Sequence, residues 1–413
     1  MGAVTSIIHT KSNANANPSR EVRTHYGLVV GRRMIDEGDF KVDAFLGIPY
    51  AKPPIGELRF QKPQPPDPWD GVLQATKFGP RAPQTDFLWE RWTYRVGKSE
   101  SCLTLNVFSP AWEPRNDQPN GFAVLVFVHG GGFIIDSAAK YGDEGICRYL
   151  CRHDVVVVTI QYRLGLLGFF STGDEVCRGN MGLWDQTLAL KWVKENISAF
   201  NGDPSRVTIF GQSAGGVCVD LLSLSPHSRD LFQQVIPMAG NAECEWGLTT
   251  NENLSVVCRE FAQKLGWKSE NKGVQASTEM LQFLRKKSAK LFERGIFGKG
   301  GIDVRKVKLD LAPVPDGDFL PKPIHVLRRE APKKRCMVGT CSYEGLLFAA
   351  IGSCNFGMKG IDQILDTIVP EENFPNWKEV RENAKELYIN KAYEKHKMAK
   401  AFLRVRLKLN CSA

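Results

Sequence analysis

The chain lacks several features that would place it in a membrane, metal-binding or secreted class. Its 413 residues contain no apolar run approaching the roughly 18 residues of a membrane-spanning helix. Its 11 cysteines include no Cys-x-x-Cys pair and no metal-ligand spacing, so we expect no metal site. Residues 1–17 have no apolar segment of the kind that a signal peptide needs. We therefore expect a cytoplasmic, intracellular protein with reduced thiols that is not secreted.

The net charge of +9 comes largely from two late basic clusters, within residues 328–335 and 391–408. Neither cluster has interleaved aromatic residues or a recognisable nucleic-acid-binding module. We expect a solvated basic surface and no nucleic-acid partner, with a nucleic-acid site as the alternative. Nothing in the sequence indicates the oligomeric state.

The first residues leave two alternatives open. Residues 1–6 fit the Met-Gly-x-x-x-Ser pattern of N-myristoylation, which would place the lipid on Gly2. The other interpretation is a disordered leader over residues 1–22. One acyl chain gives only marginal membrane binding, so the most that we expect is a weak peripheral association through this end.

The middle of the chain alternates strands and helices. Apolar runs at residues 124–129 and 155–162 suit strands that are covered on both faces of a parallel sheet. Residues 186–200 show helical spacing, and from Lys378 onward the chain reads as one long basic helix. Further strands are expected at residues 207–210, 235–239 and 336–340. This order predicts an α/β fold with a central, mostly parallel sheet flanked by helices.

A Gly-Gln-Ser-Ala-Gly sequence at residues 211–215 joins an expected strand to an expected helix. Glycines permit the sharp turn that lifts a serine hydroxyl above the edge of a sheet, and the helix N-terminus adds a positive dipole end beside it. Because the motif stands in the context it requires, we interpret Ser213 as a nucleophile rather than a structural turn serine.

A second glycine-rich motif, His-Gly-Gly-Gly-Phe at residues 129–133, closes the strand upstream of Ser213. Consecutive glycines let backbone N–H groups approach a ligand, as in the oxyanion loops of ester hydrolases. A phosphate-binding loop is excluded because no Gly-Lys-Ser/Thr follows. We expect a structural role for His129, since it lies at the start of this loop rather than opposite Ser213.

Both motifs belong to a longer pattern that resembles the type-B carboxylesterases, the carboxylesterase/cholinesterase branch of the α/β-hydrolase fold. The resemblance runs from about Tyr26 to about Phe348 and includes residues 45–51, 102–107, 179–186 and 201–204. It implies an α/β-hydrolase fold and a serine carboxylesterase acting on small-molecule esters without a cofactor.

The resemblance also assigns site residues. Ser213 would be the nucleophile, and the backbone N–H groups of Gly131, Gly132 and Ala214 would form the oxyanion hole. The acidic member of the triad lies in a Gly-Thr-x-x-x-Glu-Gly segment of the family, which here is residues 339–345 and nominates Glu344. Its position after Ser213 agrees with the Ser, acid, His order of this fold.

The sequence departs from the family pattern at the expected base. The one histidine after Glu344 is His396, which lies in the basic helix without a strand-loop context. We expect the hydrolase domain, residues 23–413, to lack its C-terminal part and to carry a basic helical tail from about 378, as a shortened isoform or an incomplete gene model would. Without the triad histidine, we expect weak or no turnover.

Smaller departures concern cysteine and aromatic residues. Ala82 stands where the family has a cysteine, so Cys102 would have no disulfide partner. Ala239 replaces a usual serine and Gln212 a usual glutamate, while Trp89 and Trp92 are interpreted as packing residues rather than a choline-binding gorge. A non-catalytic, cholinesterase-like binding or adhesion protein is the alternative to an esterase.

Overall fold

The computed structural model describes residues 17–86, 90, 96–295, 309–342, 344, 362, 365–366, 369–372 and 374–389. The candidate lipidation site at Gly2, the two tryptophans at 89 and 92, and His396 lie outside these residues. None of the described helices is long and apolar enough to cross a membrane.

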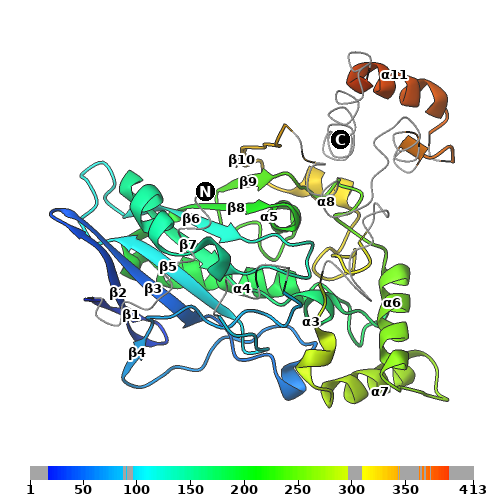
Figure 1. Ribbon diagram of the computed structural model, residues 1–413, viewed down its shortest axis with the longest axis horizontal. Helices are drawn as coiled ribbons and strands as arrows, with labels where there is room; N and C mark the ends of the chain where they lie inside the picture. Colours follow the sequence, from blue (N-terminus) through cyan, green and yellow to red (C-terminus); the bar gives the residue numbers. More distant parts are fainter. Residues whose placement is uncertain are drawn as a thin grey trace.

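A single ten-stranded sheet organises the molecule, in the order β1-β2-β3-β5-β7-β6-β8-β9-β10 with β4 paired to β2 (Figure 1). The pairings from β1 to β7 are antiparallel, whereas those from β7 to β10 are parallel. The strands are β1 Pro18–Thr24, β2 Gly27–Glu37, β3 Phe40–Pro49, β4 Val72–Gln74, β5 Thr104–Pro110, β6 Phe122–Val128, β7 Val155–Ile160, β8 Gly202–Gln212, β9 Gln234–Met238 and β10 Arg335–Cys336. The parallel half follows from the βαβ order of the sequence.

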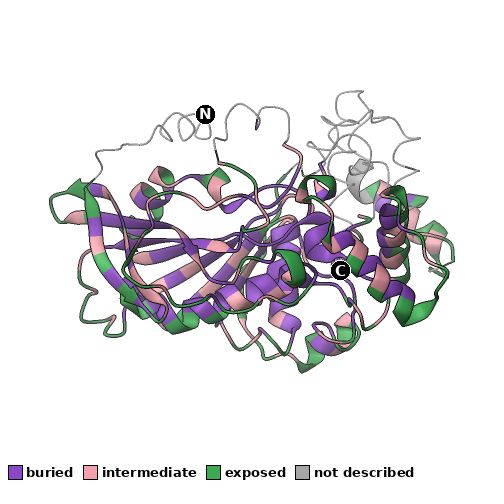
Figure 2. Cartoon of the chain, turned by 90° about the horizontal axis from the view of Figure 1, so that it is seen from below, coloured by how far each residue is buried: buried purple, intermediate pink, exposed green. Residues whose placement is uncertain are grey.

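Helices follow the strands of the parallel half, and α5 packs on β8 and β9. Figure 2 shows buried residues concentrated along the sheet and on the inner faces of the helices. The α-helices are α3 Gly165–Phe169, α4 Met181–Asn196, α5 Ala214–Leu224, α6 Asn251–Lys264, α7 Gly273–Arg285, α8 Ile324–Glu330 and α11 Trp377–Ile389. Short helices are η1 Gly56–Leu58, η2 Ala138–Tyr141, η3 Ile146–Leu150, η4 Cys151–His153, η5 Ile197–Phe200 and η6 Ala289–Phe292. The predicted α/β class, a central sheet flanked by helices, is confirmed.

The largest buried cluster fills the sheet around β6, β7 and β8, where strand residues such as Val126, Val158 and Ile209 are fully buried. Both faces of these strands are covered, which explains their continuous apolar sequences. Cys147 and Cys151 pack in a smaller cluster beside β3 and β5. Among the described residues, no group of three His, Cys, Asp or Glu side chains could hold a metal ion.

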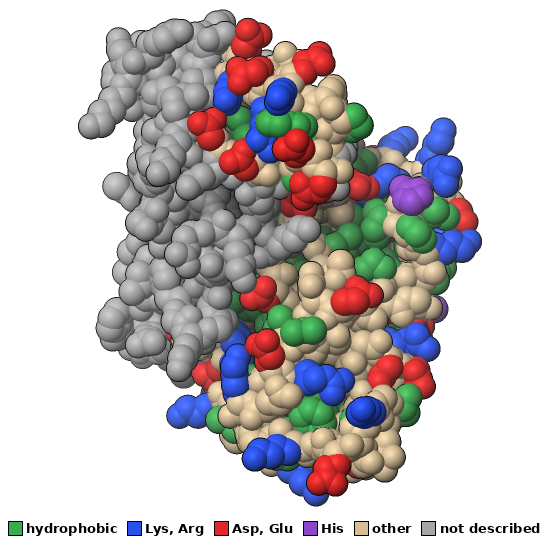
Figure 3. Space-filling model, turned by 90° about the vertical axis from the view of Figure 1, so that its right-hand side faces the viewer, with side chains coloured by type: hydrophobic (Ala, Val, Ile, Leu, Met, Phe, Trp, Pro, Cys, Tyr) green, Lys and Arg blue, Asp and Glu red, His purple; other side chains and the backbone are tan. Residues whose placement is uncertain are grey.

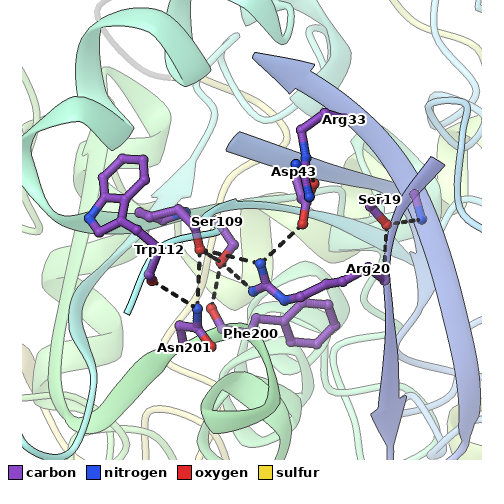
Figure 4. Close-up of polar contacts among 10 residues, drawn as sticks. Ser19, Arg20, Arg33, Asp43, Ser109, Trp112, Phe200 and Asn201 are labelled. Carbon is purple, nitrogen blue, oxygen red and sulfur yellow. Dashed lines mark hydrogen bonds and ion pairs between the residues drawn. The ribbon is translucent and has the colours of Figure 1, made fainter. Parts of the chain in front are cut away.

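We expected a disordered leader to extend to residue 22, but the first strand of the sheet, β1, already begins at Pro18. Figure 4 shows the reason: the Arg20 guanidinium reaches from β1 to the buried carboxylate of Asp43 at 3.0 Å and to Ser109 Oγ at 3.0 Å. Asp43 also accepts from Arg33 Nε at 2.5 Å. The Ser19 hydroxyl accepts from the N–H of Gly31 at 2.7 Å. These polar contacts are not visible in the hydrophobic pattern of the segment.

Element ends differ from the sequence expectations by a few residues. The helix expected at 186–200 starts at Met181 and ends at Asn196, where Ile197–Phe200 tightens into a 3₁₀ turn. The strand expected at 336–340 is only Arg335–Cys336, although Gly339 adds an isolated bridge to Met238. The basic helix expected from Lys378 begins at Trp377, and its continuation beyond Ile389 lies outside the described residues.

The side of the molecule that carries α6, α7 and α11 has mixed charge. Acidic and basic side chains are interspersed over the described part of this face, with apolar side chains between them (Figure 3). Pairs such as Lys385 with Asp362, at 3.1 Å, neutralise part of the surface around α11. The visible described surface of this face therefore offers no extended basic field.

Candidate active site

Ser213 is the single residue between β8 and α5, and its backbone conformation is strained. Its φ is 58° and its ψ is −124°, a combination that residues with a side chain rarely adopt. The Ser213 N–H donates to the Met238 carbonyl at 2.8 Å, and the Ser213 carbonyl accepts from Val217 at 3.1 Å. These contacts to β9 and to the first turn of α5 hold the serine in the sharp strand-to-helix turn that its motif predicts.

The glycines around Ser213 are required by close backbone approaches. A Cβ on Gly215 would lie 2.8 Å from the His129 carbonyl oxygen and closer still to that of Val128. A Cβ on Gly211 would lie 2.9 Å from the Val128 oxygen. The strand-to-helix turn at residues 211–215, the elbow, therefore packs so closely against the end of β6 that neither glycine can carry a side chain.

The loop that follows β6, residues 129–136, is the glycine loop, and it lies directly beside the elbow. β6 and β8 are parallel neighbours in which Val128 pairs with Gly211, so the segments that follow leave the same edge of the sheet. A Cβ on Gly130 would lie only 3.3 Å from Ser213 Cβ. The loop then turns through left-handed residues, with φ of 95° at Gly131 and 61° at Gly132. The two motifs that the sequence placed in one site are brought together.

The backbone N–H groups that we expect to form the oxyanion hole have no acceptor among the described residues. In the described part of the chain, the backbone N–H groups of Gly131, Gly132 and Ala214 donate to no acceptor. Ala214 is the first residue of α5, where such an N–H group has no partner within the helix. Free N–H groups beside a nucleophile can bind a developing oxyanion.

His129 is buried and fixes the start of the loop rather than facing Ser213 as a base. Its ring stacks on Tyr162 with centroids 4.5 Å apart. Its Nδ1 lies 3.0 Å from the Gly130 carbonyl oxygen, which can only accept, so Nδ1 carries the hydrogen. Burial lowers the pKa of His129 and favours the neutral ring. Because C=O and N–H point in opposite directions across a trans peptide, this bond turns the Gly131 N–H away from His129.

Glu344 follows a segment that is joined to the same edge of the sheet, one strand further along. Ala239 donates its N–H to the Gly339 carbonyl at 2.8 Å, which attaches the Glu344 segment to the end of β9. The Glu344 carboxylate accepts from the Cys341 N–H at 2.5 Å. Within the described residues, neither Ser213 Oγ nor Glu344 has a hydrogen-bond contact with a histidine. The segment that leads to Glu344 is therefore joined to the end of β9, whereas His396, which we did not expect to act as the base, lies outside the described residues.

The expected loss of a disulfide at Cys102 is confirmed. Cys102 is free and buried, as are most of the described cysteines. Ala82, which occupies the other position of the family pair, is fully buried. Burial raises the pKa of the Cys102 thiol, so it behaves as a small apolar core residue.

Sequence reasoning missed Gln84, whose side-chain amide contacts the far end of the glycine loop. Its Nε2 donates to the Asp136 carbonyl and its Oε1 accepts from the Asp136 N–H, both at 2.8 Å. The only sequence signal was its place after Ala82 and Pro83, in a segment that we interpreted for its missing cysteine.

The half-parallel sheet, the strained elbow and the adjacent glycine loop together define the α/β-hydrolase fold. The chain belongs to the carboxylesterase family, whose model matches residues 18–408.

Curated relatives divide between esterases and other proteins. The chain is 45% identical over 321 residues to esterase cest-33 of Caenorhabditis elegans, covering 76% of this chain and 55% of the relative. It is 43% identical to a medium-chain fatty acyl-CoA hydrolase precursor of Anas platyrhynchos, covering 58% of this chain and 43% of the relative. Neuroligin-3 of Mus musculus is 33% identical, with 84% of this chain and 45% of the relative covered. The chain spans about half the length of the curated relatives it matches.

Proposed function

We propose that this chain carries the nucleophile and oxyanion hole of a carboxylic-ester hydrolase that works through a serine acyl-enzyme. The observation that carries the proposal is the strained Ser213 with the glycine loop packed against it, together with backbone N–H groups on Gly131, Gly132 and Ala214 that make no hydrogen bond within the described residues. Esterase cest-33 and the acyl-CoA hydrolase precursor among the relatives support the same reaction type. The substrate would be a small-molecule ester.

In this mechanism, Ser213 Oγ forms a bond to the ester carbonyl carbon and loses its proton to a base. The carbonyl electron pair moves onto oxygen, where the free N–H groups stabilise the negative charge. Collapse of the tetrahedral intermediate breaks the bond to the alcohol, which leaves with a proton. Water then attacks the acyl-enzyme by the same steps and releases the acid.

The oxyanion hole and the base contribute separately to the rate of the reaction. Removing one oxyanion donor typically costs about 10²–10³ in kcat, and loss of a triad base costs about 10⁴ or more. We infer that Glu344 orients the base, in keeping with the order of residues in this fold. We expect this chain to react covalently at Ser213 more readily than it turns over, because no histidine of the described part contacts Ser213 and turnover needs a base in both the formation and the hydrolysis of the acyl-enzyme.

The test is to label the purified chain with a fluorophosphonate probe and to measure hydrolysis of p-nitrophenyl butyrate. We expect labelling that is abolished in Ser213→Ala and unchanged in Ser223→Ala, a serine on the same helix α5. Fast hydrolysis that survives His396→Ala would contradict weak turnover. A wild-type chain that folds but takes no label at Ser213 would overturn the proposal.

A second candidate is a non-catalytic binding role, which the neuroligin relatives keep open. It differs in one measurable respect, since a binding protein has no need of a reactive serine. Labelling of Ser213 together with serine-dependent hydrolysis would exclude it. A folded chain with neither property would favour it.

A further inference from the structure

The far end of the glycine loop is strained and lies outside the sheet ladder. After Gly131 and Gly132, the backbone passes through Phe133 and Asp136 with φ of 62° and 85°. The N–H groups of residues 134 and 135 both donate to the Gly131 carbonyl at 3.1 Å. Such a conformation persists only where its surroundings hold it.

One side chain supplies much of that support. Gln84 is fully buried, and its carboxamide pairs with the N–H and C=O of Asp136, each at 2.8 Å. The same Nε2 donates to the Ala82 carbonyl at 3.1 Å. The pairing imitates a step of β-ladder between segments that lie 52 residues apart in the sequence.

Gln84 is itself anchored from two directions. Its carbonyl accepts from Lys98 Nζ at 2.8 Å, and the next residue, Thr85, donates its N–H to the Arg294 carbonyl at 2.7 Å. The Asp136 carboxylate already accepts from the Ser137 N–H at 2.7 Å and Lys140 Nζ at 2.9 Å. The carboxylate therefore holds the following turn, while the backbone of Asp136 depends on Gln84.

The position of residue 136 determines that of the oxyanion donor. A Cβ on Gly131 would lie 2.8 Å from Asp136 Cβ and would overlap the Ile135 carbonyl oxygen. Gly131 is thus in direct backbone contact with the segment that Gln84 holds. A shift of residues 135–136 would move the Gly131 N–H, and oxyanion stabilisation is sensitive to displacements of that order.

We propose that Gln84 is a positioning residue for the oxyanion hole, acting through residues 135–136 on the Gly131 N–H. This role rests on the proposed ester hydrolase. It predicts that loss of the Gln84 amide slows the covalent step at Ser213 without weakening the encounter with the reagent. A side chain that served stability alone would change the fraction of folded protein but not the rate constant of that fraction.

The variants are Gln84→Met, which keeps the length but removes all three side-chain hydrogen bonds, and Gln84→Glu, which keeps the acceptor for the Asp136 N–H. The control is Gln186→Met, at an equally buried glutamine on α4. The rate constant of fluorophosphonate inactivation and the apparent dissociation constant are measured separately, with thermal midpoints alongside. We expect Gln84→Met to lose at least about tenfold in the rate constant with an unchanged dissociation constant. Gln84→Glu should lose less and the control little.

Hydrogen exchange of the peptide containing residues 131–137 is the second measurement. We expect faster exchange in Gln84→Met than in wild type or Gln186→Met, because the Asp136 N–H loses its acceptor. Unchanged exchange, or faster exchange with an unchanged inactivation rate constant, would overturn the positioning role. A wild-type chain without labelling would overturn the proposed function, and with it this role, whereas exchange would still report whether Gln84 holds the loop.

Discussion

Replacing Gly215 with alanine has two opposing effects on the free energy of unfolding, and the typical size of each is known. Gly215 is the second residue of α5, where alanine is favoured over glycine by up to about 1 kcal/mol in helix propensity. The new Cβ, however, would lie 2.8 Å from the His129 carbonyl oxygen and would overlap that of Val128. Both are backbone atoms at the end of a central strand, so neither can rotate away. Overpacking of this kind costs about 1–3 kcal/mol, and we expect Gly215→Ala to be destabilising.

The matched control is Gly145→Ala. Gly145 is helical, with φ of −62°, and nothing lies within 4 Å of its added Cβ. Propensity then acts alone, and the variant should be as stable as wild type or more stable by up to about 1 kcal/mol. Urea denaturation gives the midpoint of each protein, and the slope checks that the unfolding transition is comparable.

Gly215→Ala should also react more slowly with the fluorophosphonate probe. Displacing the Val128 and His129 carbonyls moves the start of the glycine loop, so fluorophosphonate labelling of Ser213 should slow in Gly215→Ala but not in Gly145→Ala. A Gly215→Ala chain that unfolds at or above the wild-type urea concentration and labels at the wild-type rate would refute the reasoning. The elbow would then have space for a Cβ that the distances to the Val128 and His129 carbonyl oxygens do not allow.

Three further results are expected. Asp185→Asn should cost about 3–5 kcal/mol in urea denaturation, because it leaves the buried Arg163 guanidinium, 2.7 Å from the carboxylate, without compensation; a loss under 1 kcal/mol, well below that range, would contradict this. Burial lowers the pKa of His129, so the unfolded chain takes up that proton first as the pH falls, and stability should decline below about pH 6.5. The difference in melting midpoint between wild type and His129→Asn should accordingly shrink on acidification, and a constant difference would refute it. A thiol reagent should modify the exposed Cys336 and Cys341 in the folded chain and the buried described thiols only on unfolding, and equal rates would contradict their burial.

The two motifs of the site could be predicted from sequence because each is local. The turn at Ser213 is fixed by glycines within three residues of it, and the loop at 129–133 follows a strand whose apolar run is unmistakable. Parallel strands end at one edge of a sheet, so both motifs are expected at that edge, but the direct pairing of β6 with β8 is set by the sheet order, since β7 lies between them in the sequence. Glu344 could be nominated only through the family pattern, because a glutamate after a short strand carries no local signal.

Contacts between distant segments could not be predicted in the same way. Gln84 meets Asp136 through side-chain to backbone bonds, which leave no periodicity in either segment. Arg20 joins the first strand to the sheet by an ion pair with Asp43, in a segment whose polar composition indicated disorder. Both cases involve polar groups that become buried, and hydrophobic patterning does not report their partners.

The distribution of backbone strain bears on whether the site is built for chemistry or for binding. Residues other than glycine with positive φ include Asp154, Asn180 and Asn201, which cap short helices or α4 and whose side chains tolerate that conformation.

Four others have no such tolerance: Phe60 packs against Phe170 and Phe292 away from the site, whereas Phe133, Ser213 and Ala239 lie at the elbow, at the glycine loop or where β9 meets the segment that leads to Glu344. Each costs about 1–3 kcal/mol, a substantial part of the 5–15 kcal/mol by which domains are typically stable. A surface that only binds a partner has no need to hold a serine hydroxyl in a strained turn beside free N–H groups. The strain at Phe133, Ser213 and Ala239 therefore favours the ester hydrolase over the binding role.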